Sequence, residues 1–151
     1  MYLFDKNYDL MYYKLMKKIE LDIESLRQAK ISLEKVLKVY NEGCSNQDLC
    51  DIYADSCVKR FEYTFETAWK VMKKYFKLQY SKTEEDLTMN NLFRYMEAYG
   101  FTSSWIKWKE YYFQRNSTAH EYNFIKSRKL ILIIPDFINE INFLLNKWDS
   151  L

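Results

Sequence analysis

Apolar residues recur every three or four positions along the first forty residues, which is the spacing of one face of an α-helix. The series is Tyr12, Met16, Ile19, Ile23, Leu26, Leu33, Leu37 and Tyr40, with one position skipped at Lys30. This pattern predicts a helix from about Asp5 to Tyr40 that packs lengthwise against other helices. Gly43 follows it and suits the left-handed conformation that commonly ends a helix.

A second run with the same spacing predicts another long helix, capped by Ser45 or Asn46 and reaching about Tyr80. Its apolar positions are Val58, Phe61, Phe65, Trp69, Met72 and Phe76. Two helices of about 35 residues joined by a short turn form an antiparallel hairpin roughly 50 Å long, at about 1.5 Å per residue.

Two shorter helices are predicted next. One runs from Thr88 or Asn90 to Tyr99, where a glycine follows, and the other runs from Trp105 to about Gln114. The polar residues 81–86 connect the long second helix to the first of these two.

A final helix is predicted from Asn123 onward. Its apolar stripe is Leu130, Ile134, Phe137, Ile141, Leu144 and Trp148. Pro135 lies inside this pattern, and because proline removes a helical hydrogen bond we expect a kink near residues 131–134. The chain is therefore predicted to be one all-α domain, residues 1–151, folded as an antiparallel up-and-down four-helix bundle with a split or short additional helix.

Composition agrees with this class. Gly occurs twice and Pro once, which is too few turn residues for a β-rich fold of this length. The charge is nearly balanced, with 23 Lys and Arg against 21 Asp and Glu. This balance neither supports general binding to nucleic acid nor excludes a local basic cleft. The sequence contains neither an apolar stretch of about 20 residues nor the pattern of a signal peptide, so we expect a cytoplasmic protein with no membrane association.

The cysteines and the single histidine argue against a metal site. Cys44, Cys50 and Cys57 are separated by six and seven residues, and no Cys-x-x-Cys pair occurs. We therefore expect no metal ion and no cofactor. The cysteines are interpreted as buried, reduced thiols.

The histidine, His120, lies in the segment Arg115–Tyr122, which is the candidate site. Imidazole has an ordinary pKa of about 6.5, so it can give and take a proton near neutral pH. Asn, Ser and Thr at residues 116–118 are poor in helix interiors, so the preceding helix is expected to end or loosen there. A histidine near a helix end is also commonly a cap or a hydrogen-bonded surface residue, and this alternative stays open.

Helical spacing would place Asn116 and His120 on one face, where the amide could orient the imidazole. Arg115 and His120 are five residues apart, about 140° around an ideal helix, so they would not face each other squarely. A two-fold axis near the segment would bring two copies of both residues into one cleft. Such a cleft suits RNA, because guanidinium binds phosphate oxygens and imidazole can take a proton from a 2′-hydroxyl.

Four further residues are candidates for substrate contacts. Arg60 and Glu66 lie on the second predicted helix, and Trp105 and Trp108 lie just before the candidate site. Carboxylates can bind metals, and indoles can stack on bases. The nearby cations favour a salt-bridged surface for Glu66, and the helical spacing of the tryptophans favours the core or a dimer interface.

The pattern Arg-x4-His-x-Tyr, present as Arg115, His120 and Tyr122, resembles the signature of the HEPN superfamily; Asn116 stands directly after the arginine. This short motif has little specificity alone.

Two other stretches strengthen the resemblance. Arg60–Lys70 is similar to a characteristic segment of one branch, the nucleotidyltransferase substrate-binding proteins, which are related to HEPN toxins encoded beside minimal nucleotidyltransferases. Ile134–Phe137 also fits this branch. Together these segments span most of the chain.

The resemblance implies a homodimer of four-helix bundles that works with a minimal nucleotidyltransferase. Active members of the superfamily are metal-independent endoribonucleases, so Arg115 and His120 would be catalytic across the dimer and Asn116 would tune the site. Tyr122 would correspond to the tyrosine that the partner modifies with AMP in toxin–antitoxin pairs. The added bulk and negative charge beside His120 would repel an RNA phosphate.

Three hypotheses follow from these residues. The first, which we favour on the sequence, is an endoribonuclease toxin silenced by its nucleotidyltransferase. The second is a non-catalytic subunit that binds a nucleotide or another substrate for the transferase. The third is a scaffold that only dimerises and forms the complex.

Overall fold

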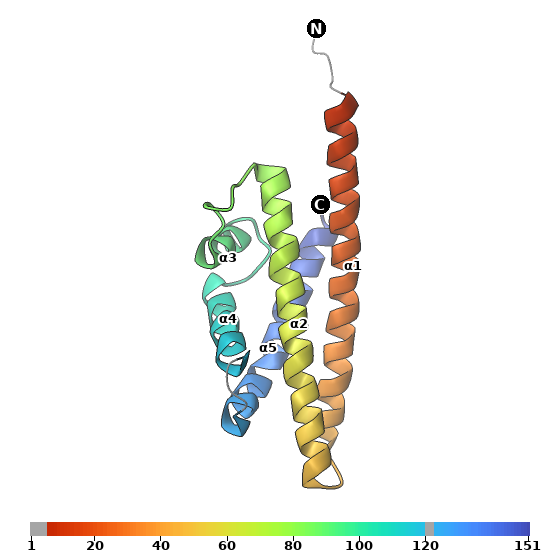
Figure 1. The fold of residues 1–151 in the computed structure, drawn as a ribbon, viewed down its shortest axis with the longest axis vertical. Helices are drawn as coiled ribbons and strands as arrows, with labels where there is room; N and C mark the ends of the chain where they lie inside the picture. The colour runs from red at the N-terminus through yellow and green to blue at the C-terminus, as the bar shows by residue number, and fades with distance from the viewer. Residues whose placement is uncertain (1–5, 120–122) are drawn as a thin grey trace.

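The computed structural model describes residues 6–119 and 123–151, and this part of the chain forms five helices and no strand. They are α1 (Lys6–Glu42), α2 (Gln47–Tyr80), α3 (Met89–Ala98), α4 (Trp105–Ala119) and α5 (Phe124–Asp149). The long helices α1 and α2 run antiparallel, α5 packs against both, and α3 and α4 lie on the side of α2 away from α1 (Figure 1). The all-α bundle with a short additional helix is thus confirmed. Within the described ranges, no helix has both the length and the apolar character needed to cross a bilayer.

Apart from the end of α4, the helix ends lie close to their predicted positions. Asn46 caps α2, and its side-chain oxygen accepts a hydrogen bond from the backbone N–H of Leu49 at 2.9 Å. Thr88 and Asn123 cap α3 and α5 in the same manner. Gly43 has a φ of 91°, the left-handed value predicted for the residue after α1.

Helix α4 is longer than the sequence predicts. It continues through residues 116–118 to Ala119 instead of ending near Gln114. The hydroxyl groups of Ser117 and Thr118 donate to the carbonyl of Gln114 at 3.1 and 3.2 Å, so these polar side chains satisfy their hydrogen bonds on the preceding turn. The predicted helix end was therefore wrong by about one turn, because back-bonding of this kind lets the helix continue.

Helix α5 contains Pro135 and continues on both sides of it. A proline can bend a helix without ending it. The kink expected near residues 131–134 stays a prediction.

The cysteines differ from the predicted state. Cys44 and Cys50 form a disulfide across the turn between α1 and α2, with Cα atoms 5.4 Å apart. That separation lies within the roughly 4.4–6.8 Å range of disulfides, and the tight turn produces it. The prediction of three reduced thiols was wrong for this pair. Cys57 keeps a buried free thiol, and its removal from water raises its pKa to about 11.

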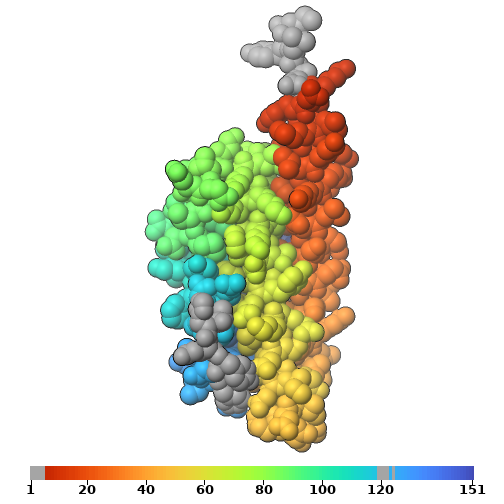
Figure 2. Space-filling model, in the orientation of Figure 1, coloured from red at the N-terminus to blue at the C-terminus, as the bar shows by residue number. Residues whose placement is uncertain are grey.

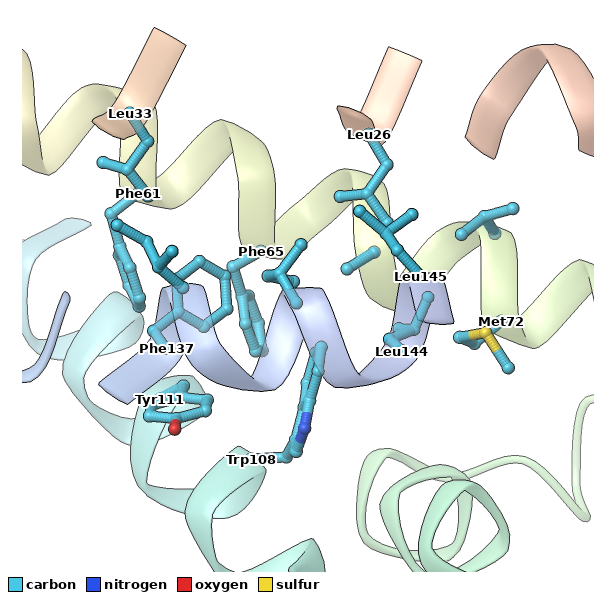
Figure 3. Packing of buried hydrophobic residues seen from close by; sticks show 14 of the residues in the cluster. Leu26, Leu33, Phe61, Phe65, Met72, Trp108, Tyr111, Phe137, Leu144 and Leu145 are labelled. Atoms are coloured by element: carbon cyan, nitrogen blue, oxygen red, sulfur yellow. The ribbon is translucent and has the colours of Figure 1, made fainter. Parts of the chain in front are cut away.

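An aromatic core joins α2, α4 and α5 (Figure 3). The ring centroid of Phe65 of α2 lies 5.8 Å from that of Trp108 and 6.3 Å from that of Phe137. The ring centroids of Tyr111 and Phe137 are 5.1 Å apart. Leucines of α1 close the other side of this core (Figure 3). Aromatic rings at these separations bury large apolar areas, so they determine where α4 lies against the long helices.

Polar contacts from α5 fix the beginning of α4. Glu140 is 3% exposed and accepts hydrogen bonds from the backbone N–H of Ser103, at 3.1 Å, and from the hydroxyl groups of Thr102 and Ser103. A carboxylate beside the first turn of a helix also interacts favourably with the helix dipole. The start of α4 is therefore held by a buried acid.

A second acid of α5 contacts α4 one turn further along. Asp136 accepts hydrogen bonds from Lys107, at 2.8 Å, and from the hydroxyl group of Tyr111. Burial by itself would raise the pKa of Asp136, but these two donors outweigh it and the pKa is lowered. The ionised carboxylate thus ties two turns of α4 to α5.

Candidate functional site

Arg115 lies on the face of α4 that turns towards α2. Its Nη1 donates a hydrogen bond to the side-chain oxygen of Asn116 at 3.2 Å, and its Nη2 lies 3.9 Å from a carboxylate oxygen of Glu66. The side chain is about one third exposed, at 35%. The packing of α2 on α4 therefore brings together three residues that the sequence analysis singled out.

A cavity of about 420 Å³ opens beside Arg115, between α2, the connector of residues 81–88 and α4. It is lined by Phe65, Trp69, Lys73, Glu84, Leu87, Thr88, Met89, Tyr112 and Arg115. Figure 2 shows the face on which α2 lies between α1 on one side and α3 and α4 on the other. The volume falls within the roughly 300–1,000 Å³ of small-molecule sites.

Two cations from different helices line this cavity. Lys73 of α2 is 24% exposed and forms an ion pair with Glu84 of the connector at 2.5 Å, while Arg115 enters from α4. The cap and first residue of α3, Thr88 and Met89, also line it, and a helix begins with a partial positive charge. The lining therefore offers positive charge from three elements.

Aromatic side chains form another part of the wall. The ring of Tyr112 lies at 27° to that of the fully buried Phe65, with centroids 6.3 Å apart. Trp69 is half-buried, and the ammonium groups of Lys70 and Lys73 lie 5.8 and 6.0 Å from its ring centroid. Flat apolar surfaces next to cations suit a ligand that has both an aromatic ring and negative charge.

Glu66 is salt-bridged, as the sequence analysis predicts, and so is Glu62 one turn before it. Glu66 pairs with Lys70 at 2.6 Å, and this hydrogen bond, helped by the charge of Arg115, lowers the pKa of Glu66. Glu62 pairs with Lys59 at 3.3 Å and accepts a hydrogen bond from Thr118 of α4 at 3.3 Å. Glu66 is thus a stable anion that holds Arg115 beside the cavity.

Arg60 does not take part in this site. Its Nε donates to the hydroxyl of Ser32 on α1 at 2.9 Å, and its Nη1 donates to Ser56. It lines a separate groove between α1 and α2 together with Ser25, Gln28 and Tyr63, among others. Six residues of helix turn a side chain about 120° from its starting direction, which explains why Arg60 and Glu66 contact different neighbours.

The two candidate tryptophans lie in different surroundings, and neither lines the cavity. Trp108 is fully buried in the aromatic core, so it has no free ring face for a ligand, and its candidacy for substrate binding is withdrawn. The helical spacing of Trp108 had favoured the core or a dimer interface, and its place in the core is confirmed. Trp105 is half-buried, and the guanidinium carbon of Arg94 lies 4.6 Å from its ring centroid, outside the cavity lining.

Comparison with known proteins identifies the family. Residues 21–150 match the profile of the family described as nucleotidyltransferase substrate binding protein like. The chain belongs to this family. Among solved structures it is similar to HI0074 from Haemophilus influenzae, described as showing the fold of a substrate binding domain of a nucleotidyltransferase. The two are 24% identical with a TM-score of 0.72 over 83% of this chain and 97% of HI0074, so they share a fold. No curated protein shows significant similarity to the sequence.

Membership of the nucleotidyltransferase substrate-binding family confirms one part of the resemblance seen in the sequence. His120 and Tyr122 lie outside the described residues, so the pairing of Arg115 with His120 and the role of Tyr122 stay predictions. In residues 6–119 and 123–151, no three His, Cys, Asp or Glu side chains gather as a metal ion would require.

The sequence analysis did not single out the polar and aromatic residues that share the cavity with Arg115. A signal was present, because Glu66, Trp69 and Lys73 are spaced by three and four residues along one side of α2. Trp69 was interpreted only as part of the apolar stripe. Tyr112 carries the same signal on α4, because it stands three residues before Arg115. Glu84 gave no comparable signal, since it reaches the cavity from the connector.

Proposed function

We propose that this protein is a non-catalytic substrate-binding subunit that works with a separate nucleotidyltransferase. Its family membership and the fold that it shares with HI0074 support this proposal. The observation that carries it is the cavity in which Lys73 and Arg115 lie beside aromatic walls. Cations from two helices suit an anionic group of the substrate, and the rings suit a flat part.

The two cations fit a role in holding a ligand. Arginine stays protonated at any physiological pH, so Arg115 offers a fixed charge and no proton transfer. Glu66 and Asn116 orient its guanidinium from two sides. Such support from neighbouring side chains keeps a binding group in position before the ligand arrives.

The test uses the intact protein and a minimal nucleotidyltransferase. We expect the two proteins to co-elute on size exclusion, and pyrophosphate release from ATP with a cell-extract acceptor pool to rise when the subunit is present. Arg115→Ala should remove most of that rise, whereas Arg60→Ala, on the other side of α2, should keep it. Equal pyrophosphate release with and without the subunit, together with separate elution, would contradict the proposal.

A second candidate is the metal-independent endoribonuclease implied by the HEPN motif, with Arg115 and His120 paired across a homodimer. The observation in its favour is that Asn116, the residue expected to tune that site, contacts the guanidinium of Arg115 directly. Incubation of the purified protein with labelled tRNA and mRNA in EDTA tests this candidate. Cleavage that His120→Ala abolishes would support it, and uncleaved RNA would exclude it. In that candidate Tyr122 is the AMP acceptor, which mass spectrometry after incubation with the transferase and ATP would detect.

A further inference from the structure

Glu84 neutralises the cations at the mouth of the cavity. One of its carboxylate oxygens contacts Lys73, at 2.5 Å, and the other contacts Lys77 one turn further along α2. The Glu84 side chain is 66% exposed, and it comes from the connector rather than from a helix. A phosphate that binds Lys73 would have to displace this carboxylate, because both anions use the same ammonium group.

The connector has other contacts that hold its shape. Its turn is closed by Asp86, which accepts hydrogen bonds from the backbone N–H of Thr83, at 2.8 Å, and from the Thr83 hydroxyl, at 2.9 Å. The side-chain amide of Asn91 on α3 donates to the backbone carbonyl of Asp86 at 3.2 Å. Glu84 takes no part in these bonds, so its side chain can leave Lys73 while the turn persists.

The ring surfaces of the cavity lie close to the same cations. Lys73 contacts Glu84 and also lies 6.0 Å from the ring centroid of Trp69, and Tyr112 lines the cavity from α4 beside Arg115. A ligand with its ring against Trp69 would therefore place its charged end near Lys73 and Arg115. A volume of about 420 Å³ fits one small molecule rather than a nucleic-acid strand.

Building on the proposed function, we infer that the cavity binds a single nucleoside phosphate, with its base against Trp69 and its phosphate on Lys73 and Arg115. Glu84 pairs with Lys73 in the empty protein and is displaced from it when the phosphate binds. The ligand brings more negative charge than the carboxylate that it replaces, so Lys73 gains a stronger partner. An uncharged nucleoside offers no charge in place of the broken ion pairs, so it binds more weakly.

Calorimetry on the isolated full-length protein with ATP, AMP and adenosine tests this inference. AMP and ATP should bind, and adenosine should bind at least about tenfold more weakly, since it lacks the charge-assisted contacts. Lys73→Ala should weaken AMP binding about tenfold, and Glu84→Gln should strengthen it several-fold. Lys74→Ala is the matched control, because Lys74 pairs with Asp22 of α1 at 2.6 Å on the other side of α2. The affinity of this variant for AMP should equal that of the wild type.

Lys73→Ala and Glu84→Gln separate a binding effect from a folding effect, since the first should weaken AMP binding and the second should strengthen it. Unchanged AMP affinity in both, or adenosine that binds as well as AMP, would overturn the inference. The experiment needs no transferase. Nucleotide binding without complex formation would leave the inference standing and remove the proposed function, and complex formation without nucleotide binding would do the reverse.

Discussion

On the side of α2 that faces α1, Arg60 and Lys74 contact Ser32 and Asp22 of the neighbouring long helix. On the side that faces α4 and the connector, Lys73 pairs with Glu84 of the connector and lines a cavity. The two sides carry similar residue types, but α1 runs along the whole length of α2, while α3 and α4 are short helices joined by irregular segments (Figure 1). Hollows of similar size lie on both sides, about 380 Å³ beside Arg60 and about 420 Å³ beside Lys73, but the wall of the second includes an irregular segment, the connector with Glu84.

The largest effect is expected from breaking the contact that positions α4. Trp108→Ala should lower the free energy of unfolding by about 3–5 kcal/mol, because it empties a fully buried position of the core. Urea denaturation followed by circular dichroism measures this. Trp108→Phe should cost much less, since the indole N–H has no hydrogen-bond partner among the described residues. A large loss for the Phe variant as well would show that the full size of the indole or its N–H is needed at this position.

The next effect compares two arginines on opposite sides of α2. Arg115→Ala should weaken AMP binding about tenfold or more, since it removes a charge-assisted contact, while Arg60→Ala should leave the affinity unchanged. Arg115→Lys should fall between the wild type and the alanine variant, because lysine keeps the charge without the planar fork. Calorimetry measures all three. Equal losses of AMP affinity for Arg60→Ala and Arg115→Ala would mean that the two sides of α2 do not differ in AMP binding.

The pH dependence of stability tests how α5 holds α4. The pKa of Asp136 is lowered in the folded protein, so its contribution is present above the pKa of the unfolded chain, about 3.9. It is lost as the pH falls below that value and through the lowered pKa of the folded state. Unfolding free energies between pH 6 and pH 2 should therefore fall less for Asp136→Asn than for the wild type. Parallel curves would show that Asp136 does not contribute.

The smallest effect concerns the thiol near Arg60. Burial raises the pKa of Cys57 to about 11, against the opposing charge of Arg60, so the thiol stays protonated at pH 8. Iodoacetamide should leave Cys57 unlabelled in the folded protein and label it in urea, as mass spectrometry can show. After gentle reduction of the disulfide, Cys44 and Cys50 should be labelled while Cys57 is not. Rapid labelling of folded Cys57 would contradict its burial.

The helices were predictable because each depends on local signals. The stripes with Ile23, Phe61 and Ile141, and the capping residue Asn46, are properties of short stretches of sequence. The extension of α4 was missed because Ser117 and Thr118 were judged by their preferences in isolated helices, whereas here they bond to the preceding turn.

The site was only partly predictable, because it depends on how distant segments pack. Arg115 and Glu66 were separate candidates, but their contact requires the packing of α2 against α4, which no local pattern specifies. Glu84 meets Lys73 only because the connector turns back over α2. The disulfide between Cys44 and Cys50 likewise depends on the shape of one turn.

The contact of Glu140 with the residues just before α4 has a consequence for the order of assembly. On the ribosome, α1 and α2 emerge first and can pair at once, since a short turn joins them. Helix α4 emerges before the acid and the aromatic residues of α5 that fix it. A nascent chain that stops short of α5 therefore has its hairpin but lacks the contacts that fix α4, so the wall of the cavity that α4 provides is positioned only after α5 is made.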